Sequence, residues 1–350
     1  MKTYNKLYKE LCSIENLSKA FRKARKRKSK RPYVKKFEAN LKNNLNKLKE
    51  ELESQTYIPR LLKKFIIREP KTRIIHASDF RDRVVYHAII NVIGDIFEKR
   101  FIHDSYASRL KKGTSKAVLR FDKFKRKVSS NGRLVNNVFD NNLVQGYLLK
   151  ADIKHYFETV SHKVLLGIIH KKIKDEKVIW IIKQILGNFS PKINGRGMPL
   201  GNLTSQFFAN VYLNELDYFV KHKLKAKYYI RYVDDFVILH KNRKILEYYK
   251  EIINNYLINK LKLKLHPDKS KILSLRNGVS FLGYKIFYHY KLLRRSNKKK
   301  FEKSFNERLN LFKEGLLTYD NFINSLHGWF GYAMQANTYK FRKEIFKNLN

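Results

Sequence analysis

Apolar positions recur with the spacing of helices and strands along most of the chain. In its first part they predict helices over residues 1–60 and a short hairpin over residues 65–75, where branched apolar residues flank a Pro-Lys-Thr turn. A longer helix is expected to follow, capped by Asp79 or Asp82. Residues 121–146 are polar, and the pattern predicts irregular structure there.

Strands and helices alternate through the second part of the chain. Residues 147–153 are apolar enough for a central strand, and Ser161 is placed to cap the helix after it. A further helix is expected after a cap at Thr204 or Ser205, and two strands are expected within residues 227–240. The remaining elements are expected as short strands in residues 266–275 and 278–287 and as basic helices over residues 291–350. This order predicts a mixed α+β fold.

The composition adds a strong positive charge to this folded chain. Of 350 residues, 76 are Lys or Arg and 30 are Asp or Glu, which gives a formal net charge of +46. The 43% share of hydrophobic residues lies well above that of disordered basic tails. Nucleic acid is therefore the first partner to expect. The densest basic run, from Arg22 to Lys36, fits either a phosphate-binding face or a solvated tail.

Cysteine use and hydropathy narrow the setting in which the chain works. Cys12 is the only cysteine, so an intrachain disulfide is excluded and a Cys-based structural zinc site is not expected. No apolar run is long enough to span a bilayer, and the N-terminal segment lacks the apolar core of a secretory signal. We therefore expect a soluble, cytoplasmic protein without a membrane partner.

Three carboxylates stand where apolar strands end. Asp234 and Asp235 lie between the two strands predicted within residues 227–240, and Asp152 lies at the end of strand 147–153. A lone Asp-Asp pair is typical of a simple turn. Flanked by strands on a strongly basic chain, the pair favours a metal site, because adjacent carboxylates repel unless a cation compensates. If the strands are neighbours, the three side chains can hold two Mg²⁺ ions, for which Mn²⁺ can substitute, and support nucleotidyl transfer.

Several motifs resemble those of reverse transcriptases and occur in the same order. YVDDF at residues 232–236 resembles the family signature, and ADIKHYF at residues 151–157 resembles the motif that supplies the first metal-binding aspartate. The other matching segments are KTRII (71–75), DRVVYHAI (82–89), GMPLGNLTSQFFANVYLNELD (197–217), HPDKSKI (266–272) and GVSFLGYKIF (278–287). Several motifs in the right order are far more specific than any one of them.

The resemblance implies a right-hand polymerase with fingers, palm and thumb, in which the palm sheet is antiparallel and the thumb is helical. The expected parts are a basic N-terminal helical region (1–60), fingers (61–146), palm (147–290, with a fingers–palm segment at 170–200 and a primer-grip-like segment at 278–287) and thumb (291–350). The implied activity is RNA-directed DNA polymerisation, encoded by a bacterium or a phage. Its partners would be template RNA, the cDNA and its RNA–DNA hybrid, and dNTPs.

Catalytic roles carry over by position from the motifs of the family. Asp152 and Asp234 would be the principal metal ligands, with Asp235 beside them and the carbonyl of Ile153 as a further oxygen. Phe157 matches the bulky gate that would clash with a ribose 2′-hydroxyl and so select dNTPs, with an ordinary core aromatic as the alternative.

Cations carry over in the same way. Lys71 and Arg73 match fingers residues that hold the triphosphate, a task suited to paired cations. Lys269 matches a lysine proposed to protonate the leaving pyrophosphate, and a solvated loop lysine is the alternative. Because surface cations are often generic, position in the motifs is what assigns these roles.

The nucleotide-pocket motif departs from the commonest pattern of the family. Many group II intron and retroviral enzymes have Gln-Gly followed by Ser-Pro, whereas this chain has Leu200, Gly201 and, after Asn-Leu-Thr-Ser, Gln206. Leu200 removes an amide that could hydrogen-bond the incoming nucleotide, so fidelity should fall, unless Leu200 simply packs well. The LGNLTSQ form resembles the enzymes of diversity-generating retroelements. These copy a template RNA with errors at adenines and work with a small basic accessory protein.

Two alternatives to a diversity-generating enzyme remain open. One is a phage-defence or retron-like reverse transcriptase, which shares the palm. The other is a catalytically idle RNA-binding scaffold that uses only the charge of +46. The sequence leaves open the cognate RNA and its priming, the need for an accessory protein and the actual fidelity.

Overall fold

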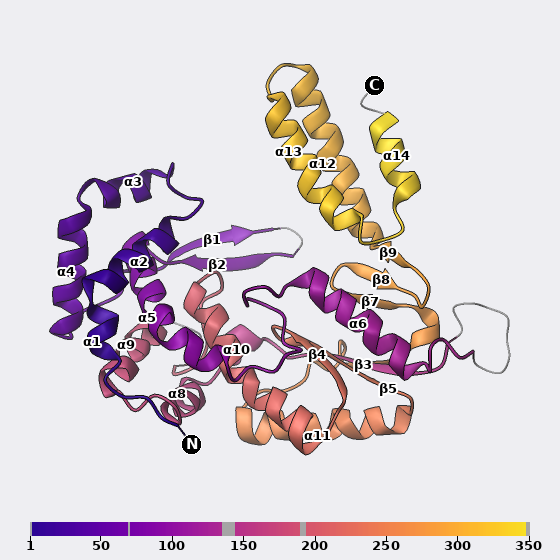
Figure 1. The fold of residues 1–350 in the computed structure, drawn as a ribbon, viewed down its shortest axis with the longest axis horizontal. Helices are drawn as coiled ribbons and strands as arrows, with labels where there is room; N and C mark the ends of the chain where they lie inside the picture. The colour runs from indigo at the N-terminus through magenta and orange to yellow at the C-terminus, as the bar shows by residue number, and fades with distance from the viewer. Residues whose placement is uncertain (1, 69–70, 135–143, 190–193, 348–350) are drawn as a thin grey trace.

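Helices form the N-terminal part of the chain and pack around one long helix (Figure 1). The computed structural model describes residues 2–68, 71–134, 144–189 and 194–347. The helices of this part are α1 (Tyr8–Cys12), α2 (Ile14–Arg25), α3 (Pro32–Ala39), α4 (Leu41–Glu53) and α5 (Phe80–Glu98). The carboxylate of Asp79 accepts from the backbone N–H of Arg81 and caps α5, as the sequence predicts. The apolar stripe of α5 is buried against α2, which makes α5 the centre of this part.

A two-stranded hairpin follows α4 in the chain and leads into α5. Strand β1 (Lys63–Ile67) pairs antiparallel with β2 (Arg73–Ala77), and Phe65 lies opposite Ile75. The predicted hairpin is therefore confirmed, although residues 69–70 lie outside the described residues. Most side chains of both strands are exposed. The hairpin projects above the sheet that carries the carboxylates (Figure 1).

Helix α6 (Thr114–Val128) occupies the start of the segment that the sequence predicts to be irregular. That prediction is wrong for residues 121–128. Phe121, Phe124 and Val128 are spaced so that they lie on one helical face and are buried, while the lysines and arginines between them mostly face outward. The dense positive charge hid this amphipathic pattern. Residues 135–143 of the same predicted segment lie outside the described residues.

The central sheet is antiparallel and has four strands in the order β4-β5-β3-β6. The strands are β3 (Tyr147–Asp152), β4 (Tyr228–Tyr232), β5 (Asp235–His240) and β6 (Lys271–Ser274). Helix α11 (Arg243–Leu261) contacts β3, β5 and β6, whereas α6 contacts β4 and β5 from the other face (Figure 1). Alternate residues of a strand enter different cores, so Leu148 packs on the α6 side and Leu149 on the α11 side. The predicted strands 147–153 and 227–240 are thus confirmed.

Further helices connect β3 to β4. They are α7 (Tyr156–Thr159), α8 (His162–His170), α9 (Glu176–Gly187) and α10 (Leu203–Tyr218), with a π-helical turn η1 (Phe219–Lys223) after α10. Ser161 caps α8, as predicted, since its hydroxyl accepts from the N–H of Val164. Helix α10 begins at Leu203, one residue before the predicted cap at Thr204 or Ser205. The reason is local: the left-handed φ of +103° at Gly201 leads to an extended Asn202, and the helix starts directly after it.

The C-terminal part joins a small sheet to a helical bundle. A 3₁₀ turn η2 (Leu275–Asn277) leads into an antiparallel sheet of β7 (Val279–Phe281), β8 (Tyr284–Ile286) and β9 (Lys291–Leu293), followed by α12 (Arg295–Lys313), α13 (Tyr319–Ala333) and α14 (Tyr339–Lys347). The sequence predicts helix from residue 291 onward, and this is wrong for β9, whose pairing with β8 fixes it as a strand. The three helices share an aromatic core of their own and stand above the small sheet (Figure 1).

Candidate active site

Two of the predicted carboxylates come from neighbouring strands. Antiparallel pairing of β3 with β5 places Asp152 directly opposite Asp235, at the end of the shared register. Cβ atoms of directly opposite residues lie about 4.5–5.5 Å apart, so the two side chains lie side by side on the same face of the sheet. Asp234 precedes Asp235 in the loop that joins β4 to β5. The structure therefore brings all three residues to the same end of the central strand pair β3–β5, as the sequence analysis expects.

The carboxylates at this end of the β3–β5 pair disfavour each other's charge. Burial, together with the nearby charges of Asp235 and Asp152, raises the pKa of Asp234 to about 6, against the opposing charge of Arg73. Burial also raises the pKa of Asp235, with Asp152 adding to the shift. Lys150, Lys269 and Lys71 oppose the rise at Asp235. A site with this much unfavourable negative charge is prepared to accept cations.

Lys269 reaches the same end of the β3–β5 pair from the loop before β6. Its Nζ lies 3.2 Å from Oδ2 of Asp152 in an ion pair. The loop is fixed to the strand end, since the N–H of His266 donates to the carbonyl of Asp152 at 2.7 Å and Ser270 also contacts the Asp152 main chain. Ile153 is buried and bridges antiparallel to Leu265, which continues this contact. The structure thus brings Lys269 and Ile153 next to Asp152.

The β1–β2 hairpin brings two further predicted cations toward the carboxylates. The charges of Lys71 and Arg73 act on Asp235 and Asp234 respectively, although no direct ion pair joins them within the described residues. Both cations lie at the turn end of a hairpin that is largely exposed: Lys71 is in the turn, and Arg73 begins β2 opposite Ile67. They can therefore meet a polyphosphate that lies between the hairpin and the sheet.

The nucleotide-pocket motif packs on the hairpin rather than on the carboxylates. The carbonyl of Leu200 accepts from the N–H of His76 at 3.0 Å. A Cβ at Gly201 would lie 2.7 Å from Cγ2 of Ile75, so this close approach requires glycine. The exposed Gln206, on α10, accepts from Ser108 at 3.3 Å. Among the described residues, no contact joins these three positions to the three aspartates directly.

Phe157 holds the turn after β3 against the segment that leads into the pocket motif. Its carbonyl accepts from the N–H of Met198 at 2.6 Å, and its half-buried ring makes an edge contact with Tyr156. Tyr156 is fully buried and donates to the carbonyl of Ala209 on α10. Both the gate and the core-aromatic interpretations of Phe157 are compatible with this position.

Sequence reasoning missed two cations that border the site. Lys150 lies two residues before Asp152 on the same face of β3, and its Nζ donates to the carbonyl of Ser280 in β7 at 3.2 Å. Arg231 lies within β4 and is fully buried. The signal was present in both cases, because a charged residue inside an otherwise apolar strand requires a specific partner.

The donor set fits divalent cations by its chemistry. Hard carboxylate oxygens are the ligands that Mg²⁺ and Mn²⁺ prefer, and bound cations would offset the burial and the mutual repulsion that together raise the pKa of Asp234 to about 6. Among the described residues, no three Asp, Glu, His or Cys side chains are already arranged to coordinate one ion. Asp152 is engaged by Lys269 instead, so metal binding requires that this carboxylate turn or share its oxygens.

Within the described ranges, none of the helices combines the length and the apolar character that crossing a bilayer requires.

The fold itself is an α+β right hand, with an antiparallel palm sheet between a fingers-like hairpin and a helical bundle (Figure 1). This is the architecture of nucleic-acid polymerases.

Comparison with known proteins assigns the family within that class. Residues 61–286 match the family model described as reverse transcriptase (RNA-dependent DNA polymerase). This match covers more than half of the chain. The chain belongs to the reverse transcriptase family, and its enzyme class is RNA-directed DNA polymerase.

Relatives include proteins encoded by group II introns. Protein YkfC of Escherichia coli strain K12 is 25% identical over 293 residues, which cover 71% of this chain and 73% of that protein. The group II intron-encoded protein LtrA of Lactococcus lactis subsp. cremoris is 24% identical over 312 residues, which cover 69% of this chain and 49% of LtrA. The chain thus spans about half the length of LtrA. Telomerase from Candida albicans aligns with a TM-score of 0.49 and 10% identity over 73% of this chain and 52% of that chain.

Proposed function

We propose that this chain copies an RNA template into cDNA, using Asp152, Asp234 and Asp235 as its catalytic carboxylates. The observation that supports this most is the strand pairing that sets Asp152 opposite Asp235, with Asp234 beside them. The proposed parts are a basic N-terminal region (1–60), fingers (61–146), palm (147–290) and thumb (291–350). The template RNA, the RNA–DNA hybrid and dNTPs are the proposed partners.

The roles of the site residues follow from their positions. Asp152, Asp234 and Asp235, with the carbonyl of Ile153, would hold two Mg²⁺ ions, or Mn²⁺ in their place. When bound, such ions activate the 3′-hydroxyl of the primer and stabilise the pyrophosphate that leaves. Lys71 and Arg73 bind the triphosphate, whose negative charge complements theirs.

Two further positions act beside the carboxylates. Lys269, which lies 3.2 Å from Asp152, gives a proton to the leaving pyrophosphate in this proposal. Phe157 excludes a ribose 2′-hydroxyl. Leu200, Gly201 and Gln206 shape the pocket from the side of the hairpin, where Leu200 and Gly201 contact β2.

Primer extension tests this proposal directly. The full chain would be given an RNA template, an annealed DNA primer and dNTPs, and Asp234→Asn would be compared with Asp95→Asn, which changes an exposed carboxylate on α5. We expect Asp234→Asn to abolish cDNA synthesis while RNA affinity stays unchanged. A scaffold that only binds RNA predicts no cDNA synthesis by the wild type or by either variant.

The subtype that we propose is an error-prone enzyme of a diversity-generating retroelement, which works with a small basic accessory protein. Support comes from the LGNLTSQ segment, in which Leu200 offers the incoming nucleotide no side-chain hydrogen bond. Sequencing of cDNA made on an adenine-containing RNA tests it. Errors concentrated at template adenines support mutagenic copying, whereas equal error rates at the four bases favour a defence-type or retron-like enzyme.

A further inference from the structure

Arg231 is a charged residue at the centre of the fold that the proposed chemistry does not use. It is 0% exposed and lies in β4, two residues before the loop that carries Asp234. Its backbone is fixed from one side, because its N–H donates to the carbonyl of Asp104 and its carbonyl accepts from the N–H of Tyr106, both at 3.0 Å. A buried guanidinium needs partners for its hydrogen-bond donors, so where those donors point is informative.

One side of the guanidinium is held by a buried carboxylate on α10. Nε and Nη2 of Arg231 donate to the two oxygens of Asp217 at 2.8 and 2.7 Å, which is a bidentate pair. Asp217 is also 0% exposed, and it accepts a further hydrogen bond from the hydroxyl of Tyr229 at 2.7 Å. Although burial alone would lower the pKa of Arg231, Asp217 raises it above its usual value. The arginine is therefore charged and locked in orientation.

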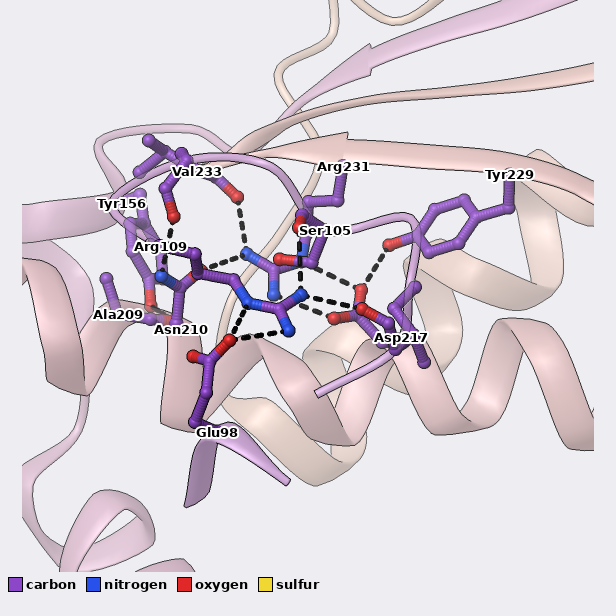
Figure 2. A network of polar contacts seen from close by, with 12 residues as sticks. Glu98, Ser105, Arg109, Tyr156, Ala209, Asn210, Asp217, Tyr229, Arg231 and Val233 are labelled. Atoms are coloured by element: carbon purple, nitrogen blue, oxygen red, sulfur yellow. Dashed lines mark hydrogen bonds and ion pairs between the residues drawn. The ribbon is translucent and has the colours of Figure 1, made fainter. Parts of the chain in front are cut away.

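The remaining nitrogen of the guanidinium points at the catalytic loop. Nη1 donates to Oδ1 of Asn210 at 3.1 Å and to the carbonyl of Val233 at 3.0 Å. Figure 2 shows the guanidinium of Arg231 between Asp217 and the Val233 carbonyl, with Asn210 beside it. A rigid helix is thus connected through one side chain to the peptide group immediately before Asp234.

Val233 needs such support because of its backbone conformation. Its φ is +57°, in the left-handed region that β-branched residues strongly avoid. Tyr232 pairs with Asp235, so Val233 and Asp234 form a two-residue hairpin loop, a place where glycine usually supplies the positive φ. The carbonyl of Val233 belongs to the peptide group that leads into Asp234. The orientation of this peptide group therefore sets the direction in which the Asp234 side chain leaves the loop.

We propose that Arg231 is a positioning residue, which uses the buried Asp217 pair to hold the Val233 carbonyl and so fixes the strained loop that presents Asp234 and Asp235. This inference rests on the proposed catalytic role of these aspartates. Arg231 itself touches no substrate. It follows that Arg231 is needed because Val233 is strained, and that relief of this strain should make Arg231 less important for catalysis.

The test compares two substitutions within the same buried cluster. Arg231→Lys keeps the charge, but one ammonium group cannot hold Asp217 bidentately and reach Val233 as well. Tyr229→Phe is the matched control, because it removes a hydrogen bond to Asp217 without touching Val233. At equal folded fraction, we expect Arg231→Lys to lower kcat for dNTP incorporation at least about 10-fold, with RNA affinity unchanged. Tyr229→Phe is expected to change kcat less than about 3-fold.

A second substitution separates positioning from plain stability. Val233→Gly, made in the Arg231→Lys background, should restore kcat at least about 3-fold, because glycine adopts the positive φ without the arginine. If Arg231→Lys does not fold, Asp217→Asn replaces it and the same restoration by Val233→Gly is expected. An unchanged kcat on adding Val233→Gly, or equal losses for Arg231→Lys and Tyr229→Phe, would overturn the inference. Loss of synthesis in Asp234→Asn shows separately that the proposed function holds.

Discussion

The ammonium group of Lys269 lies 3.2 Å from a carboxylate oxygen of Asp152, and this ion pair joins the loop before β6 to the end of β3. Replacement of Lys269 by Met should lower the single-turnover rate of nucleotide incorporation by about 100-fold, because proton transfer by a positioned group contributes on that order. Rapid-quench measurement of one incorporation step checks this. Lys271→Met changes an exposed lysine of β6 and is the control. Equal rates for both variants would leave Lys269 as a solvated loop lysine.

Asp234 makes the folded state less stable at neutral pH, and the direction follows from its raised pKa. The folded protein holds this proton up to about pH 6, whereas the unfolded chain releases it near pH 4. Stability therefore falls as pH rises through that window. Without metal ions, Asp234→Asn should raise the free energy of unfolding at pH 8 by about 1–3 kcal/mol, and by less at pH 5.

Urea unfolding at the two pH values, in the presence of a chelator, measures this difference. Asp95→Asn should show no such gain, because its carboxylate is exposed on α5. A gain for Asp234→Asn of equal size at both pH values would contradict the raised pKa.

Helix α6 is joined to the small sheet by an aromatic contact. The rings of Phe121 and Phe281 stack with centroids 5.2 Å apart, and Phe121 is fully buried. Phe121→Ala should cost about 3–5 kcal/mol of unfolding free energy. Leu119→Ala, on the exposed side of the same helix, should stay within about 0.5 kcal/mol of the wild type. Similar losses for both would mean that α6 does not bury the face described here.

Sequence patterns predicted the elements whose signals are local. Strand 147–153 and the hairpin around Asp234 were identified because apolar runs and turn residues lie next to each other, and their pairing followed from the resemblance. Helix α6 was missed at Phe121 because lysines and arginines dominate its sequence. The only sign of its apolar face was the spacing of a few apolar residues among these charged ones.

The least predictable part of the site is the link between Arg231 and Asp217. These residues are 14 positions apart and lie on a strand and a helix that meet only in the folded chain. The contact of Leu200 with His76 is likewise set by tertiary packing. Periodicity reports which face of an element is buried, but it does not report which buried charge meets which partner.

Leu200 gives a prediction about fidelity. Leu200→Gln restores an amide that can hydrogen-bond the incoming nucleotide, so the error rate at template adenines should fall by about 10-fold or more. Deep sequencing of cDNA checks this, with Leu200→Met as the control that keeps an apolar side chain. Unchanged adenine errors in Leu200→Gln would show that this side chain does not set fidelity.

A titration of the full chain with Mn²⁺, monitored by electron paramagnetic resonance, tests most directly whether the three aspartates bind divalent cations together. If Asp152, Asp234 and Asp235 form one cation site, then Asp152→Asn and Asp234→Asn should each weaken Mn²⁺ binding by about 10-fold or more, since affinity follows the number of charged ligands. Asp95→Asn should bind as the wild type does. Equal Mn²⁺ affinity in the wild type and all three variants would show that these carboxylates do not form one cation site.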